Sequence, residues 1–246
     1  MKKSIYLLAI TVVTVICVIW GTTAHMGGHF GFIRLGNEEI ADYSNDYKLD
    51  AFDSIFVDAD VMELDIKQGA EFGLQYECTE DLIPEYSVEN KKLTIKQKHK
   101  KNYWVGTHRC SVIVTVPSGT SLKNLDISSD VGDVTINNVS ADICSGETNV
   151  GDFVIKNAEV KELYWESDTG NIEVENCSFT KLDLTADVGD VEIESSKKLD
   201  DYGFDLKTDV GEVKVNGEEY GRKCIMHGDA GSITVKSDVG DVKVED

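Results

Sequence analysis

The sequence predicts an all-β protein, a β-solenoid of coils about 20 residues long, preceded by one N-terminal transmembrane helix. Three observations support this fold class. A segment typified by TADVGDVEIE at Thr185–Glu194 recurs from residue 128 onward, apolar and polar residues alternate in the copies, and a long apolar run stands near the N-terminus. A fixed period near 20 residues is typical of stacked repeats.

Composition limits the class of protein and of partner. The chain has 246 residues, of which 41% are apolar and 28% charged, so it can fold around a core. Its formal net charge is -21. That charge argues against nucleic acid, whose phosphates are bound by Lys and Arg, and against electrostatic attachment to anionic lipid. We therefore expect no nucleic-acid partner.

Residues 1–24 have the features of a signal anchor. Lys2 and Lys3 precede an apolar run from Ile5 to Trp20, long enough to cross a bilayer. A cleaved signal peptide is the alternative. Basic residues before the run and an acidic chain after it place the remainder outside. We expect a retained single-pass anchor in the cell membrane, with the C-terminal domain extracytoplasmic.

The rest of the chain divides by pattern into three parts. Residues 25–45 are rich in glycine and are predicted to be a spacer. Residues 46–120 are predicted to form a degenerate first coil, in which Met62 and Glu63 replace Gly-Asp, and an irregular β cap. The basic run Lys96–Lys101 is expected to be a solvated strand edge. Residues 121–246 form the repeat β-solenoid.

Seven glycines mark the repeats, and each is predicted to sit at a structural turn. The intervals between them are 19, 19, 19, 22, 20 and 9 residues, and the short last interval indicates that the winding shortens or folds back. These glycines are Gly132, Gly151, Gly170, Gly189, Gly211, Gly231 and Gly240.

The repeats keep one register of apolar residues. With the residue before each glycine as position 0, positions -6, -4, -2 and 0 should face inward, and so should +3 and +5. All six columns are apolar or small in nearly every copy. Stacked coils require this, because equivalent residues lie about 4.8 Å apart and share one interior column. A β-sandwich of the same strands is the alternative, but it would not need the shared register.

The residues at the turns have a structural explanation and a functional one. Glycine suits a backbone with positive φ, and Asp or Asn can accept hydrogen bonds from backbone amides of the turn. Stacked carboxylates could also bind calcium, with Asp187, Asp190 and Asp209 as weak candidates. The calcium-binding nonapeptide pattern is absent, so we favour the structural explanation and expect no cofactor.

The six cysteines include no CxxC pair and no close metal-ligand spacing, which argues against a zinc site. A Cys78–Cys110 bridge is conceivable if the domain is extracellular. The alternative is that these cysteines are small buried apolar residues.

The chain resembles a known bacterial family. The N-terminal apolar segment, Leu93-x-Ile95, the strand ending at Val116-Pro117, and the repeated Asp-x-Gly-Asp-Val-x-Ile motif are similar to the "putative adhesin" β-strand-repeat domains, a family of unknown function. The resemblance extends from about Phe52 to Asp246. It implies a β-solenoid-like fold, frequent single-pass anchoring and, in some relatives, an association with cell-envelope stress genes. It implies no catalytic residues.

These observations favour a non-enzymatic, membrane-anchored extracytoplasmic protein that acts as an adhesin-like scaffold or cell-envelope stress module. Its partner would be an envelope component or a protein, and the N-terminal helix would contact the membrane. The alternative is a polysaccharide-acting β-helix enzyme that uses surface carboxylates. Tyr164, Trp165 and Glu166 form the most distinctive local group, but Trp165 falls in an inward column. No common hydrolase, zinc-protease or phosphate-loop motif is present, so we assign no catalytic residue.

Overall fold

The computed structural model describes residues 43–97 and 109–246, which lie in one compact unit. Within these residues, twenty strands and one short 3-10 helix, η1 (Glu80–Leu82), follow one another. The strands are β1 (Tyr43–Lys48), β2 (Ser54–Val61), β3 (Glu63–Gly69), β4 (Gly73–Cys78), β5 (Glu85–Glu89), β6 (Lys92–Lys96), β7 (Cys110–Pro117), β8 (Ser121–Val131), β9 (Val134–Asn137), β10 (Ser140–Val150), β11 (Phe153–Lys156), β12 (Glu159–Thr169), β13 (Ile172–Val188), β14 (Val191–Ser195), β15 (Tyr202–Val210), β16 (Val213–Val215), β17 (Glu218–Glu219), β18 (Lys223–Met226), β19 (Gly231–Val239) and β20 (Val242–Glu245).

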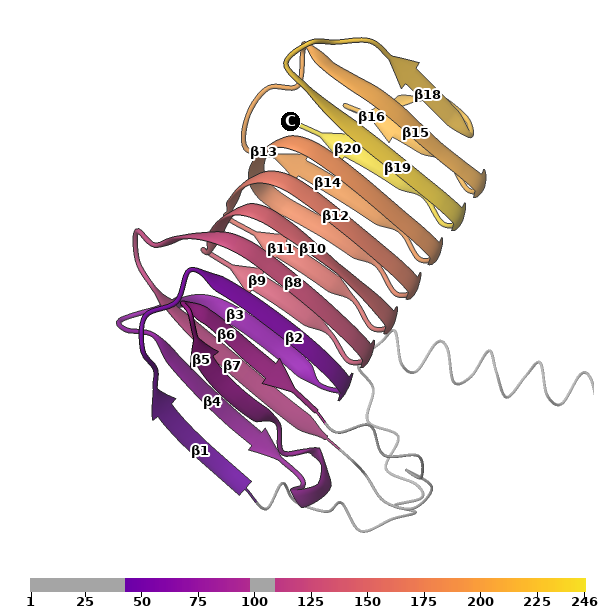
Figure 1. The fold of residues 1–246 in the computed structure, drawn as a ribbon. Helices are drawn as coiled ribbons and strands as arrows, with labels where there is room; N and C mark the ends of the chain where they lie inside the picture. Colours follow the sequence, from indigo (N-terminus) through magenta and orange to yellow (C-terminus); the bar gives the residue numbers. More distant parts are fainter. Residues whose placement is uncertain (1–42, 98–108) are drawn as a thin grey trace, which may run out of the picture. The chain divides into compact units, whose positions relative to one another are not determined.

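The strands wind into coils that stack on one another (Figure 1). Each coil places one strand in sheet A and one in sheet B, and β13 runs continuously through both. Sheet A has the order β1, β4, β7, β3, β9, β11, β13, β14, β20, β16, β17. Sheet B has the order β5, β6, β2, β8, β10, β12, β13, β19, β15, β18.

The pairing between coils follows the 19-residue period of the sequence. Val134 pairs with Phe153, which pairs with Ile172, and the strands run parallel throughout the repeats. The predicted all-β repeat fold is therefore confirmed. Antiparallel strands occur at the ends of the stack, where β1, β4 and β5 lie at one end and β17 and β18 at the other. They cover the parallel coil edges, which would otherwise present unpaired backbone groups.

Two coils lie out of chain order. The β2–β3 coil is inserted between the β6–β7 and β8–β9 coils. The β19–β20 coil is likewise inserted between the β13–β14 and β15–β16 coils. The chain thus passes over one position, turns back through β17 and β18, and fills the gap last. This return explains the short interval before Gly240.

The interior lies between sheets A and B and is filled by the side chains on their facing surfaces. In the +3 column every member of the six regular coils is fully buried, namely Val134, Phe153, Ile172, Val191, Val213 and Val242. The +5 column and most of the -6 and -4 columns are buried as well, and small residues at -2 fill the space beside the turn. Close packing along these columns stabilises the stack.

Position 0 does not belong to the interior, contrary to the sequence prediction. The valines there are 44% to 57% exposed, and they are Val131, Val150, Val188, Val210 and Val239. The reason is local, because the preceding Asp or Asn also points outward and the strict alternation of the strand ends two residues before the glycine. Equivalent positions pair between coils, so these valines, with Thr169 between Val150 and Val188, form an exposed line along one edge, which we call the valine ladder.

The predicted transmembrane helix over residues 1–24 lies outside the described residues, as does most of the predicted spacer. Within the part of the chain that the structure describes, there is no helix with the length and apolar character needed to cross a bilayer.

Candidate functional site

Six of the predicted turn glycines lie on one edge of the stack, directly above one another. Their φ angles lie between +130° and +154°, a region that side chains disfavour, and they are Gly132, Gly151, Gly170, Gly189, Gly211 and Gly240. A Cβ on Gly189 would lie 2.0 Å from the carbonyl oxygen of Gly170, and a Cβ on Gly170 would lie equally close to that of Gly151. Glycine is therefore required both by the backbone angle and by the approach of the next coil.

Gly231 differs from this set, and its prediction as a turn is corrected. It is the first residue of β19 and lacks a positive φ. A Cβ there would lie 2.4 Å from the ring of Tyr202 and 2.6 Å from the carbonyl oxygen of Thr180. Glycine at this position permits a close approach inside the stack. The sequence Gly-Ser-Ile-Thr-Val at 231–235 resembles a turn glycine followed by its strand, because apolar and polar residues alternate in β19 as they do after the turn glycines.

The residues that follow the turn glycines link one coil to the next. In every coil but the last, a side-chain oxygen of this residue accepts a hydrogen bond from the backbone N–H of the equivalent residue in the adjacent coil, at 2.7 to 3.0 Å. This aspartate ladder runs in the order Asp133, Asp152, Asn171, Asp190, Asp241 and Glu212. The aspartates thus satisfy backbone donors that the turn leaves without a strand partner.

The three calcium candidates are not brought together. Asp190 accepts its bond from the N–H of Asp241 as part of the aspartate ladder. Asp187 and Asp209 lie on strands separated by inserted β19, which carries Asp238 between them. Among the described residues there is no group of three or more His, Cys, Asp or Glu side chains arranged to hold a metal ion.

Cys78 and Cys110 form a disulfide between neighbouring strands β4 and β7. The bridge joins the antiparallel cap to the outermost coil in sheet A. Cys144, Cys177 and Cys224 are buried free thiols. Burial raises the pKa of Cys144 and raises that of Cys177 to about 11. These two thiols are therefore protonated at neutral pH and unsuited to nucleophilic chemistry.

A hollow lies on the outer face of sheet B, and we call it the sheet B groove. It has a volume of about 620 Å³ and is lined by residues of β8, β10, β12, β13 and β19. Its carboxylates are Asp126, Glu147, Glu166 and Asp183, and its one cation is Lys236. A second hollow, of about 580 Å³, shares Asp126 with the groove and extends toward β5 and β6.

Tyr164 lies near the middle of the sheet B groove and is held by charged neighbours. Its hydroxyl donates a hydrogen bond to Glu162 at 2.5 Å, and the Lys181 ammonium lies 4.9 Å from the centre of its ring. The hydrogen bond with Tyr164 and the charges of Asp183 and Glu162 raise the pKa of Lys181. Because a cation covers the ring, this face is suited to polar and ionic contacts rather than to stacking against a sugar.

Trp165, the neighbour of Tyr164, belongs to the core, as its inward column predicted. It is 1% exposed, its indole stacks on Phe153 with ring centres 3.6 Å apart, and its Nε1 donates a hydrogen bond to Thr148 at 3.4 Å. Gly146 provides the room, since a Cβ there would lie 2.5 Å from the indole. Of the distinctive local group, only Tyr164 and Glu166 therefore reach the outer face.

The stack of parallel coils, with its glycine turns and aspartate ladder, lies in the part of the chain that matches a known protein family. A family model described as Toastrack DUF4097 matches residues 52–246. The chain belongs to this family. The resemblance drawn from the sequence is thereby confirmed. No curated protein matches the chain.

Of three similar solved structures, one has a TM-score above 0.5 and supports the fold. A "putative cell adhesion protein" from Clostridium sporogenes ATCC 15579 is 16% identical, with a TM-score of 0.51 over 82% of this chain and 98% of that chain. A "putative adhesin" from Bacteroides fragilis NCTC 9343 is 15% identical, with a TM-score of 0.45 over 82% and 95%. Another, from Parabacteroides merdae ATCC 43184, is 14% identical, with a TM-score of 0.32 over 86% and 98%. At such identities the likeness concerns the fold alone.

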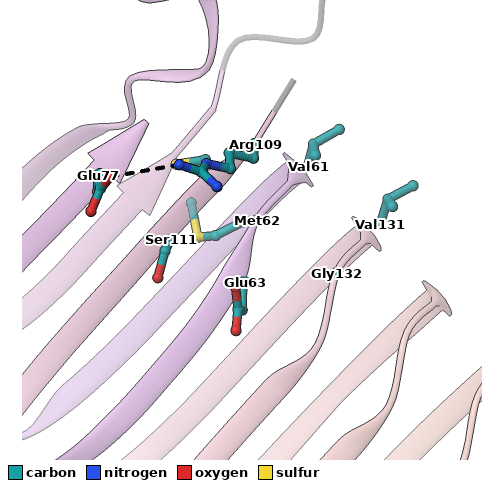
Figure 2. A pocket seen from close by; sticks show the side chains of 9 residues that line it. Val61, Met62, Glu63, Glu77, Arg109, Ser111, Val131 and Gly132 are labelled. Atoms are coloured by element: carbon teal, nitrogen blue, oxygen red, sulfur yellow. Dashed lines mark ion pairs between the residues drawn. The ribbon is translucent and has the colours of Figure 1, made fainter. Parts of the chain in front are cut away.

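A smaller hollow in this Toastrack chain, of about 350 Å³, lies where β2 turns into β3 (Figure 2). Glu77 and Arg109 face each other across it at 3.8 Å. Figure 2 also shows Val61 and Val131 projecting from the same edge, so the valine ladder continues to the β2–β3 coil. The ion pair is exposed and contributes little to stability, and we assign no function to this hollow.

Two structural devices of the Toastrack chain were missed by the sequence analysis. Gln97, predicted as part of a solvated edge, is 4% exposed and hydrogen-bonds the backbone of Asp60, Val61 and Leu82. The turn opposite the glycines uses asparagines with φ near +50°, namely Asn138, Asn157, Asn176 and Asn216. Asparagine tolerates this angle better than most residues, and the recurrent Asn after each second strand was the available signal.

An acidic surface lies on the outer face of sheet A. Glu173 and Glu192 are register neighbours on β13 and β14, with Glu175 close by. Burial, and then the charges of Glu175, Glu192 and Asp152, raise the pKa of Glu173 above its ordinary value of 4.5. The fold therefore accepts an electrostatic cost at this point of the stack.

Proposed function

We propose that this chain is a non-enzymatic, membrane-anchored extracytoplasmic protein whose β-solenoid of about 20-residue coils acts as an adhesin-like scaffold or cell-envelope stress module. The observation that carries the proposal is the sheet B groove, in which five stacked strands present carboxylates, hydroxyls and one lysine to solvent. The backbone beneath these side chains is fixed by parallel pairing on both sides. A rigid, extended polar face suits binding to an extended partner.

The Cys78–Cys110 disulfide supports an extracytoplasmic location, because such bonds persist in oxidising compartments. The apolar run at Ile5–Trp20 supports attachment to a membrane. The similar structure described as a putative cell adhesion protein agrees with a binding role. The partner we propose is an envelope component or a protein, held by polar and ionic contacts.

A polysaccharide-acting enzyme is the second candidate. Glu147 and Glu166 favour it, because they are register neighbours inside the sheet B groove and glycoside hydrolases use paired carboxylates. Carboxylates recur along the whole stack, however, as expected of a structural feature. Incubation of the full chain with cell-wall polysaccharides separates the candidates, since an enzyme releases reducing ends that the Glu166→Gln variant does not.

The binding role is tested by capturing envelope fractions, glycans and proteins on the immobilised full chain in detergent. Ser145→Arg places a bulky cation in the sheet B groove, and Thr135→Arg places the same side chain on the outer face of sheet A as a matched control. We expect a captured partner whose binding is lost with Ser145→Arg and kept with Thr135→Arg. Absence of any captured partner, or equal loss with both variants, would overturn the proposal.

A further inference from the structure

The outer face of sheet B carries a single row of charges that changes sign along the stack. Strand pairing sets the side chains of the row in the order Glu147, Glu166, Thr185, Lys236 and Lys207. The residues alternate with buried neighbours on their strands, so all five point outward. Two anions therefore lie on one side of Thr185 and two cations on the other, with about 4.8 Å between successive strands.

The two halves of the row lack partners strong enough to neutralise them within the chain. Among the described residues, Glu166 and Lys236 make no ion pair. Glu147 accepts a hydrogen bond from Ser128, a neutral donor. Lys207 contacts Asp209 on its own strand at 2.6 Å, but both side chains are more than half exposed, so this pair is weak. The row thus offers both signs of charge to solvent.

We propose that the partner of the sheet B face is a second copy of this chain, docked face to face with its stack running in the opposite direction. A two-fold axis parallel to β13 and passing at Thr185 sets Glu166 of each copy against Lys236 of the other. The next pair outward is Glu147 with Lys207. This inference rests on the proposed function, since it names the occupant of the same face.

The symmetry of the row supports this arrangement. Equal spacing on both sides of Thr185 means that one rotation aligns both pairs at once, which yields four Glu–Lys contacts per dimer. The strand on the axis points Lys181, Asp183, Thr185 and Asp187 outward, so each of the strands that face each other there carries one net negative charge, which the four Glu–Lys contacts have to outweigh. An isologous interface needs such a self-complementary surface.

The other two-fold orientation, with its axis along the stack, is disfavoured. It sets each coil against its own copy, and β12 would then bring Glu166 close to Glu162 of the other copy. Since the chain has a net charge of -21, any association has to overcome general repulsion. Only the arrangement with opposed stacks places the cations of the row where the anions are.

Charge reversal tests the pairing. In detergent-solubilised full chain, sedimentation equilibrium is measured for Glu147→Lys with Glu166→Lys, and for Lys207→Glu with Lys236→Glu. Each double variant should self-associate at least about tenfold more weakly than the parent, because close charge pairs couple by at least a tenfold factor in affinity. An equimolar mixture of the two should regain association as a heterodimer. Raising the salt concentration should weaken the parent dimer.

The matched control for Glu147→Lys with Glu166→Lys is Glu173→Lys with Glu192→Lys, which reverses two register neighbours on sheet A and changes the net charge by the same amount. It should leave self-association intact. Melting temperatures no lower than that of the parent exclude misfolding as the cause. A monomeric parent, equal effects of the control, or no recovery in the mixture would overturn the proposal. If the parent is monomeric while Ser145→Arg still abolishes capture of a different partner, the proposed function stands and this inference alone fails.

Discussion

The side chain of Asp152 accepts a hydrogen bond from the backbone N–H of Asn171 at 2.7 Å, across the boundary between two coils. Asn171 in turn accepts one from Asp190 at 3.0 Å. Because carboxylate and amide oxygens serve equally, the ladder depends on an acceptor at this position rather than on its charge.

This equivalence predicts the behaviour of two variants at Asp152. Asp152→Ala should lower the free energy of unfolding by about 1 kcal/mol, since it leaves a backbone donor without its acceptor. Asp152→Asn should retain most of the stability. Chemical denaturation measures both. The control Asp168→Ala, at an exposed carboxylate outside the aspartate ladder, should change stability by less than about 0.5 kcal/mol. Equal losses at the two sites would contradict the ladder's role.

Metal removal should leave the fold unchanged. The ladder oxygens already accept backbone hydrogen bonds, and Asp187 and Asp209 are separated by an inserted strand. Thermal melts with excess EDTA and with excess calcium should therefore coincide. A rise in melting temperature with calcium that EDTA reverses would show that the carboxylates bind the ion.

The turn glycines should be far less tolerant than glycines in open loops. Gly189→Ala combines an unfavourable φ of +154° with a Cβ 2.0 Å from the neighbouring carbonyl oxygen. Gly217→Ala has a positive φ of +77° but open space around it. Backbone strain alone costs about 1 to 3 kcal/mol. Denaturation should show a larger loss for Gly189→Ala, and a loss no larger than that of Gly217→Ala would refute the stacking argument.

Glu173 should make stability depend on pH in the acidic range. Its pKa in the folded protein is raised, so the folded state holds the proton more tightly than the unfolded chain does. The resulting stabilisation is present below the ordinary pKa of 4.5 and is lost as the pH rises through the folded value. Glu173→Gln should therefore raise the melting temperature at pH 7 and leave it unchanged below pH 4.5. Glu166→Gln, on sheet B, should not reproduce this difference.

Loss of the Cys78–Cys110 bond should destabilise the chain by about 2 to 4 kcal/mol, since a cross-link limits the unfolded ensemble. Cys78→Ser, Cys110→Ser and the double variant should lose similar amounts, because each removes the same bond. Non-reducing peptide mapping should identify the linked pair. Additive losses in the double variant would indicate that the two residues act independently.

Sequence periodicity predicted the coils because their formation is local. Alternation around Ile172 and Val174 specifies a strand, and Gly170 specifies the turn before it, within a few residues. The valine ladder was misassigned for an equally local reason, since Asp187 and Val188 both point outward where the chain bends. Nothing in an apolar side chain distinguishes the last interior residue from the first exterior one.

The order of the coils and the sheet B groove could not be read from the repeats. Coils with similar faces can stack in any order, so the place of β19–β20 depends on long-range packing and on the linker 196–201, which has to pass one coil. Glu166 and Lys236 become near neighbours only after that insertion. The repeats therefore predicted that each residue of the charge row lies on a strand, but not the order in which these strands stack.

The inserted β19–β20 coil constrains how the chain can be made. A ribosome releases residues 202–215 before residues 231–245, yet the later segment has to enter a slot bounded on both sides by earlier ones. Addition of one layer after another in the order of the chain is thus impossible at this end. Closure is a late, non-local event, and a nascent chain halted before residue 231 lacks an internal layer rather than a terminal one.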